Sequence, residues 1–242
     1  MFVLAQVLGR TAGEGFYAYL SHNAMVAVFA PAFILPLIAV GVSLRRYWRE
    51  IGGERLRLSH LLGAFRNAAT LKDLSGGQGQ GCNFEKQDRY SNTRRVLHQA
   101  VLYGFLLCFA ATSVATLMHY VLGWEAPYGF FTPPKLLGVP GGIMLSIGTL
   151  GLAWLKTQAD PNLGERKVWG GEMAFVLLLF VVAISGLALY AATGTSWVFG
   201  LLALHLGAVL AFFLVIPYSK MVHGFYRLAA LARDVQEKEA IR

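Results

Sequence analysis

The sequence has little cysteine and little charge. Its only two cysteines are Cys82 and Cys108, so the chain has no disulfide framework, no Cys-x-x-Cys-His haem attachment site and no set of thiolates for an iron–sulfur cluster. Charged residues make up 14% of the 242 residues, whereas hydrophobic residues make up 56%. So few charged side chains cannot cover the surface of a water-soluble domain of this size. The composition therefore predicts a membrane-embedded protein, and a redox centre on this chain must use ligands other than cysteine.

Charged residues are also absent from the interiors of five apolar windows of about 20 residues, the length that crosses roughly 30 Å of hydrocarbon. The windows are 24–44, 96–122, 137–155, 173–192 and 198–218. We therefore expect an all-α fold, a single membrane domain over residues 1–242 built as an integral membrane bundle of five transmembrane helices. A small transporter or channel is a rival interpretation, but coupled transport usually places an acidic or basic residue inside a span.

The net charge of +8 is unevenly distributed between the loops. Of the 21 lysines and arginines, 11 lie within 45–95, three within 156–167 and five within 220–242, all on one side of the predicted membrane. Only Arg10 and Lys135 belong to the other side. The positive-inside rule then predicts a cytoplasmic loop over 45–95, a cytoplasmic tail over 219–242 and an N-terminus outside. Nucleic-acid binding is not expected, because the sequence has no basic stripe interleaved with aromatics and no recognisable binding module.

Four histidines recur at membrane-spanning intervals. His205 and His223 are 18 residues apart, which is five whole helical turns, so we expect both on one face of one helix, about 27 Å apart along its axis. His98 and His119 are 21 residues apart on the second span, about 31 Å along the axis. Because these two spans run in opposite directions, His98 and His223 are predicted at the cytoplasmic level, and His119 and His205 at the outer level.

Two pairs of imidazoles facing each other across a bundle are typical of b-type haem ligation. We therefore predict a di-haem cytochrome b type of bundle with two haems b. His98 and His223 would bind one haem iron, and His119 and His205 the other. Zinc is not expected, because ligands divided between the two sides of a membrane cannot converge on one tetrahedral ion. The alternative for each histidine taken singly is an interfacial, hydrogen-bonded role.

The remaining two histidines are candidates for a different contact. His22, near the outer end of the first span, and His60, in the 45–95 loop, could supply a hydrogen bond and a proton to a quinone. The alternative for both is a structural or solvated side chain. Glycines recur in the third window at 141, 142, 148 and 151, and such small residues let a neighbouring helix or a macrocycle approach the backbone closely.

Several motifs resemble one known family. They include Arg94-Arg95-Val-Leu-His98, Ala115-Thr-Leu-Met-His119-Tyr120, and the run from His205-Leu-Gly to Pro217-Tyr-Ser-Lys-Met-Val-His223. Together with Gly81-Cys82-Asn83 they resemble the membrane domain of the citrate/tricarballylate utilisation protein B (CitB/TcuB) family over roughly residues 15–235. The His205/His223 spacing is more distantly similar to that of the di-haem gamma subunit of respiratory nitrate reductases.

The resemblance implies a membrane electron carrier of the bacterial cytoplasmic (inner) membrane, a component of an oxidoreductase system rather than a stand-alone enzyme. Its expected partners are a flavoprotein dehydrogenase that oxidises tricarballylate or a citrate-type acid, a ferredoxin-like iron–sulfur module, and the membrane quinone pool. The haem residues that it implies are His98, His119, His205 and His223. A haem-free membrane anchor or assembly subunit is the alternative.

The chain departs from the family pattern in two places. The family often has two adjacent histidines where this chain has His98-Gln99, which bears on the inner haem. The ferredoxin-like part is missing from this sequence, and the apolar run 2–8 is predicted to be the remnant of a preceding helix. Iron–sulfur clusters are therefore expected only on a partner polypeptide or on a part that this chain lacks.

Overall fold

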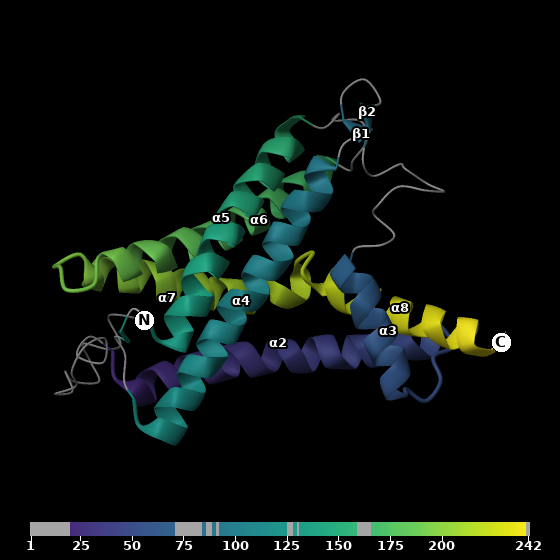
Figure 1. The fold of residues 1–242 in the computed structure, drawn as a ribbon, viewed down its shortest axis with the longest axis horizontal. Helices are drawn as coiled ribbons and strands as arrows, with labels where there is room; N and C mark the ends of the chain where they lie inside the picture. The colour runs from purple at the N-terminus through teal and green to yellow at the C-terminus, as the bar shows by residue number, and fades with distance from the viewer. Residues whose placement is uncertain are drawn as a thin grey trace.

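Figure 1 shows the computed structural model of the chain. It describes residues 20–70, 84–85, 89–90, 92–124, 128–129, 131–158 and 166–240; the predicted remnant helix at 2–8 and the motif at 81–83 lie outside them. Within the described residues, five helices are long and apolar enough to cross a membrane. They are α2 (His22–Glu50), α4 (Thr93–Leu122), α5 (Pro133–Gln158), α6 (Arg166–Ala191) and α7 (Val198–Val215), which continues into the 3-10 helix η4 (Ile216–Tyr218). The predicted all-α fold with five candidate membrane spans is confirmed.

The loop and the tail contain structure that the sequence analysis did not predict. The 45–95 loop holds helix α3 (Leu58–Thr70) and two short antiparallel strands, β1 (Phe84–Glu85) and β2 (Arg89–Tyr90). The tail forms helix α8 (Val222–Ala240), which packs against α3. Three buried residues, Ala64, Leu231 and Ala232, form the centre of this contact, and Trp48 of α2 packs against them. The two segments are therefore joined in one folded unit at the end of α2.

The prediction that His205 and His223 lie on one continuous helix is wrong. Helix α7 ends at Val215, η4 follows, and α8 begins only at Val222. The physical reason is Pro217, which lacks an N–H donor and clashes with the carbonyl of the preceding turn. Ser219 then accepts two hydrogen bonds from the backbone of the turn. Its hydroxyl oxygen accepts from the N–H of Met221, and its carbonyl oxygen accepts from the N–H of Val222.

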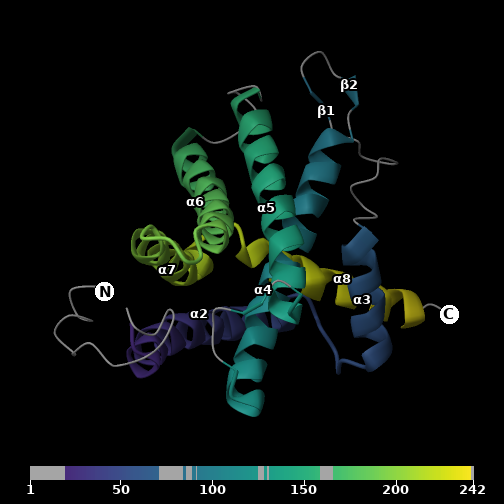
Figure 2. The ribbon, with the colours of Figure 1, turned by 60° about the vertical axis from the view of Figure 1, so that its left-hand side comes forward.

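The spans pack in the order α4, α5, α6, α7 and α2. Figure 2 shows α4 and α5 side by side. Their backbones approach each other at glycines: a Cβ on Gly104 would lie 2.6 Å from the backbone nitrogen of Leu145, and one on Gly148 would lie 2.9 Å from the carbonyl oxygen of Leu97. The glycine-rich face of the third window thus serves close packing of a neighbouring helix, one of the two uses expected for it.

Phenylalanine rings fill the interior where α2, α4, α6 and α7 converge. Phe212 of α7 has its ring centroid 5.7 Å from that of Phe105 of α4 and 6.1 Å from that of Phe175 of α6. The ring centroid of Phe33 of α2 lies 5.0 Å from that of Phe213 of α7. Along α4, Phe105 lies between His98 and His119. An apolar aromatic core therefore occupies the interval between the two levels of histidine.

Candidate functional site

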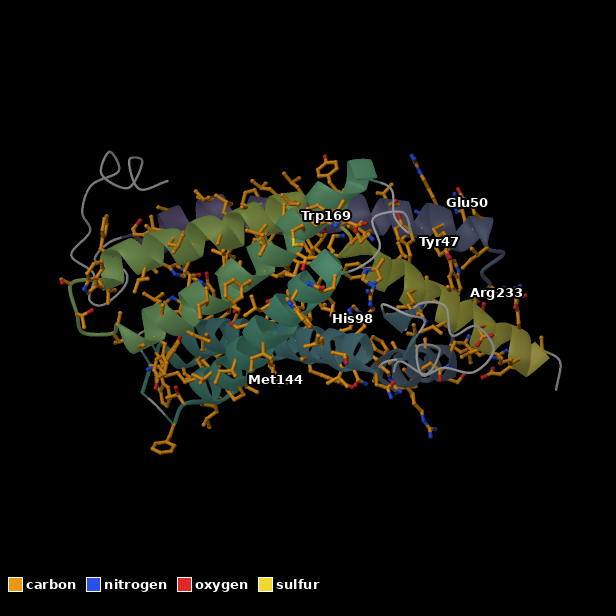
Figure 3. All side chains as sticks on the ribbon, turned by 90° about the horizontal axis from the view of Figure 1, so that it is seen from above. Tyr47, Glu50, His98, Met144, Trp169 and Arg233 are labelled. Atoms are coloured by element: carbon orange, nitrogen blue, oxygen red, sulfur yellow. The ribbon has the colours of Figure 1, made fainter. Side chains whose placement is uncertain are left out.

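The structure brings His98 and His223 together. His98 lies in the second turn of α4 and His223 is the second residue of α8, and their ring centroids are 6.0 Å apart with planes inclined by 45°. Figure 3 places His98 near the middle of the molecule, where the spans meet the α3 and α8 unit. These are the two histidines that the charge distribution assigned to one membrane level. Their role as ligands stays a prediction.

The hinge before α8 fixes the orientation of His223. Its Nδ1 donates to the carbonyl oxygen of Lys220, so the proton is on Nδ1 and the lone pair stays on Nε2. The ammonium of Lys220 in turn binds the carboxylate of Glu172 on α6, which also binds Lys156 of α5. One carboxylate thus ties two other parts of the chain to α6 next to this histidine. Arg227, one turn further along α8, is close enough to act electrostatically on His98.

The spacing of the His98 and His223 rings is close to that of two imidazoles bound to one metal ion. Two imidazoles bound on opposite sides of one metal ion through metal–nitrogen bonds of about 2 Å have ring centroids roughly 6 Å apart. His98 and His223 have this spacing. An Nδ1–H held by a backbone carbonyl is also the usual support for a histidine that binds a metal through Nε2. The spacing of the two rings is thus compatible with both imidazoles binding one metal ion, and a haem at this position stays a prediction.

At the opposite end of α4, His119 has a partner that the sequence analysis did not assign to it. The ring of His22, the first residue of α2, stacks on His119 with centroids 4.4 Å apart and planes inclined by 28°. The Nε2 of His22 lies 2.9 Å from the hydroxyl oxygen of Tyr120. Stacked faces at this distance do not have the trans arrangement of two axial ligands. The available signal was positional, since His22 and His119 both end a span on the same predicted side.

His205 is held by a serine and a glycine of α6. Its Nδ1 lies 3.1 Å from the hydroxyl oxygen of Ser185, which is almost fully buried and lies 3.2 Å from the carbonyl oxygen of Val182. With the serine proton donated to that carbonyl, the serine oxygen would accept from Nδ1–H and Nε2 would keep its lone pair. A Cβ on Gly186 would lie 3.0 Å from the Cε1 of His205. Ser185 and Gly186 were missed because a serine and a glycine in an apolar window look like ordinary packing residues.

His60 belongs to the contact between α3 and α8. Its side chain is buried, its Nδ1 accepts from the backbone N–H of Arg57 at 3.2 Å, and its Nε2 lies 3.0 Å from a carboxylate oxygen of Glu239. The amide of Gln236 approaches the same Nδ1 at 3.3 Å. Both ring nitrogens are therefore engaged within the α3 and α8 unit. These contacts favour the structural alternative, and a quinone contact at His60 stays a prediction.

A conventional metal cluster is not seen in the part of the chain that the structure describes: no three or more His, Cys, Asp or Glu side chains there are grouped to hold an ion. A haem takes at most two ligands from the protein, so a pair of histidines can hold one without a third side chain.

Comparison with known proteins gives one family. A family model described as "Citrate utilization protein B" matches residues 3–242. The citrate utilization protein B of Escherichia coli is 44% identical over 223 residues, which are 92% of this chain and 59% of that protein. The chain thus spans less than two thirds of the length of this relative. No solved structure matches.

Proposed function

Because this chain belongs to the citrate utilization protein B family and carries five helices able to span a membrane, we propose that it is a cytochrome b-like electron-transfer subunit. It takes electrons from a cytoplasmic flavoprotein dehydrogenase through a ferredoxin-like iron–sulfur module and passes them to a membrane quinone. The flavoprotein acts on a citrate- or tricarballylate-type acid. The observation that carries the proposal is the 6.0 Å spacing of the His98 and His223 rings.

One haem b is proposed at each end of the bundle, the inner one supported by the spacing of His98 and His223 and the outer one by the sequence alone. His98 and His223 would hold the haem iron at the inner level, and His119 and His205 would hold the one at the outer level. When bound, each haem supplies a one-electron redox centre. The protein orients the ligands: the Lys220 carbonyl holds Nδ1 of His223 and the Ser185 hydroxyl holds Nδ1 of His205. Arg227, which acts electrostatically on His98, would supply a positive charge for a haem carboxylate at the inner level.

The aromatic core contributes by excluding water between the two levels. Phe105, Phe212 and Phe213 pack against one another and against neighbouring helices in this interval. Fixed centres in a dry, low-dielectric interior need little rearrangement of their surroundings when their charge changes. The chain therefore acts as a scaffold for electron movement rather than as a catalyst of bond making.

The quinone contact is proposed at the outer level. His22 and Tyr120 place an imidazole nitrogen and a phenol oxygen 2.9 Å apart at the ends of two spans. Both groups can donate a hydrogen bond to a quinone oxygen and exchange a proton with it. Their position beside His119 favours electron transfer from the outer centre.

The proposal is tested on the purified full chain. We expect dithionite to produce b-type absorption bands, a pyridine haemochrome assay to give two haems per chain, and a soluble quinone analogue to reoxidise the reduced protein. If the purified protein has no such bands and does not retain added haem, the electron-carrier proposal fails and a haem-free anchor or assembly subunit replaces it. Coupled movement of a solute across vesicles would instead indicate a transporter.

A further inference from the structure

Helix α3 has one face packed against α8. Ala64 is completely buried there, and a Cβ on Gly63 would lie 3.1 Å from a methyl group of Val235. His60 lies on the same side and binds Glu239. This face is fully explained by the contact with α8.

The opposite face of α3 is apolar and exposed. Leu58, Leu62 and Phe65 are 71%, 61% and 57% exposed. Spacings of four and three residues place these side chains within about 60° of one another around the helix and on the side away from Ala64. Lipid-facing residues of the spans have similar exposure, for example Leu35 at 64%. The stripe on α3 therefore needs an apolar environment that the described part of the chain does not supply.

The position of α3 identifies that environment. The helix begins eight residues after α2 ends at Glu50, and Trp48 of α2 packs against its buried side. In Figures 1 and 2, α3 runs across the direction of α2. Figure 3 shows Tyr47 and Glu50 of α2 and Arg233 of α8 at the same end of the molecule. The helix therefore lies where α2 leaves the membrane and runs across the span instead of continuing it.

The charges around the stripe favour a lipid surface. Arg55 and Arg57 precede Leu58, Arg66 follows Phe65, and all three are exposed. The nearby Glu54 is turned toward Arg233 of α8. An apolar stripe bordered by arginines, next to the end of a span, is the pattern of a helix lying in the membrane interface, with its apolar side among acyl chains and its cations at anionic headgroups.

We propose that α3 is an interfacial helix: Leu58, Leu62 and Phe65 insert into the leaflet where α2 ends, and Arg55, Arg57 and Arg66 contact anionic phospholipid headgroups. The inference does not depend on the haem sites. It gives α3 a mechanical role, because α3 holds α8 through His60 and Ala64, and α8 carries His223. The lipid contact thus sets the depth of α8.

The experiment uses the full chain in lipid nanodiscs containing phosphatidylglycerol, with Cys82→Ser and Cys108→Ala as background. A nitroxide label is attached at Leu62→Cys, at Leu117→Cys as a lipid-facing control on α4, and at Lys238→Cys as a water-facing control on α8. Electron paramagnetic resonance then measures collision of each label with oxygen, which concentrates in lipid, and with a water-soluble nickel chelate.

We expect the Leu62 label to resemble the Leu117 label, with a ratio of oxygen to nickel accessibility several-fold higher than at Lys238. Replacing phosphatidylglycerol by a zwitterionic lipid, or introducing Arg55→Gln and Arg57→Gln together, should lower the ratio at Leu62 and leave it unchanged at Leu117. A water-like ratio at Leu62 would overturn the proposal. Protection of Leu62 from both reagents would also overturn it, because a protein partner or a second copy would then cover the stripe. An unchanged ratio without the anionic lipid would refute the role of the arginines.

Discussion

His223 faces His98 at 6.0 Å between ring centroids while its own Nδ1 is bonded to the carbonyl of Lys220. The side chain of that same lysine binds Glu172 on α6. The position of one imidazole of the inner pair is therefore determined by the hinge between η4 and α8, and the other by the start of α4. A substitution that breaks a contact at the hinge is therefore expected to move His223 relative to His98.

The inner pair gives the most direct prediction. His98→Ala and His223→Ala should each reduce the haem content from two to one and should remove the same haem, because both rings would bind one iron. The measurement is a haemochrome assay together with a redox titration of the remaining centre. The pairing is wrong if the two variants retain centres with different midpoint potentials.

The outer level is tested by four variants. We expect His119→Ala and His205→Ala to remove the other haem, whereas His22→Ala should keep both haems and raise the KM for a quinone analogue. Tyr120→Phe should have the same effect as His22→Ala, because it removes the hydroxyl that lies 2.9 Å from His22. Loss of the outer haem in His22→Ala with retention in His205→Ala would instead make His22 the partner of His119.

Glu172 is expected to stabilise the hinge. Glu172→Gln removes the charge that binds Lys156 and Lys220, and we expect a loss of about 2 kcal/mol in the free energy of unfolding, measured by SDS titration of the detergent-solubilised protein. The midpoint potential of the inner centre should shift as well. The matched control is Asp234→Asn, which breaks an exposed pair with Lys238 on α8 and should cost less than about 0.5 kcal/mol. Equal losses in the two variants would contradict this role.

The glycine contact between α4 and α5 predicts a large effect from one methyl group. Gly104→Ala places a Cβ 2.6 Å from the backbone of Leu145, so the helices must separate, and we expect a cost of about 1–3 kcal/mol in the same titration. Gly207→Ala on α7 is the control, because no neighbouring atom lies within 4 Å of its added Cβ. It should be neutral or stabilising by up to roughly 1 kcal/mol. A neutral Gly104→Ala variant would show that the two helices are not this close.

His60 is predicted to be structural. His60→Ala leaves the N–H of Arg57 without its acceptor and a cavity beside Gln236, at a cost of about 1–3 kcal/mol. Hydrogen exchange should become faster across α3, while two haems are retained. Glu239→Gln keeps an acceptor for Nε2 and should change exchange much less. Unchanged exchange together with weakened quinone reduction would assign His60 to a quinone contact instead.

The spans were predictable because each is an uninterrupted apolar run. Such a run can be recognised from its own residues, without knowing which helices pack against it. The prediction that His98 and His223 share a level followed from the same information, because charge asymmetry predicts the direction of every span. The helical break was not predicted because a count of turns ignored Pro217. Helix α3 was missed because its 13 residues are too short to cross a membrane and its apolar residues are interrupted by Ser59, Gly63 and Arg66, so a search for spans passes over it. Its amphipathic spacing was nevertheless present in the sequence.

The helix break after α7 means that His205 and His223 are held by different parts of the molecule. His205 contacts Ser185 of α6 within the packed spans, whereas His223 belongs to a helix that packs mainly against α3 and the end of α2. A substitution in the α3 and α8 unit is therefore expected to move His223 more than His205. The two ends of the bundle are thus subject to different constraints, and changes in the loop and tail are expected to act on one histidine pair before the other.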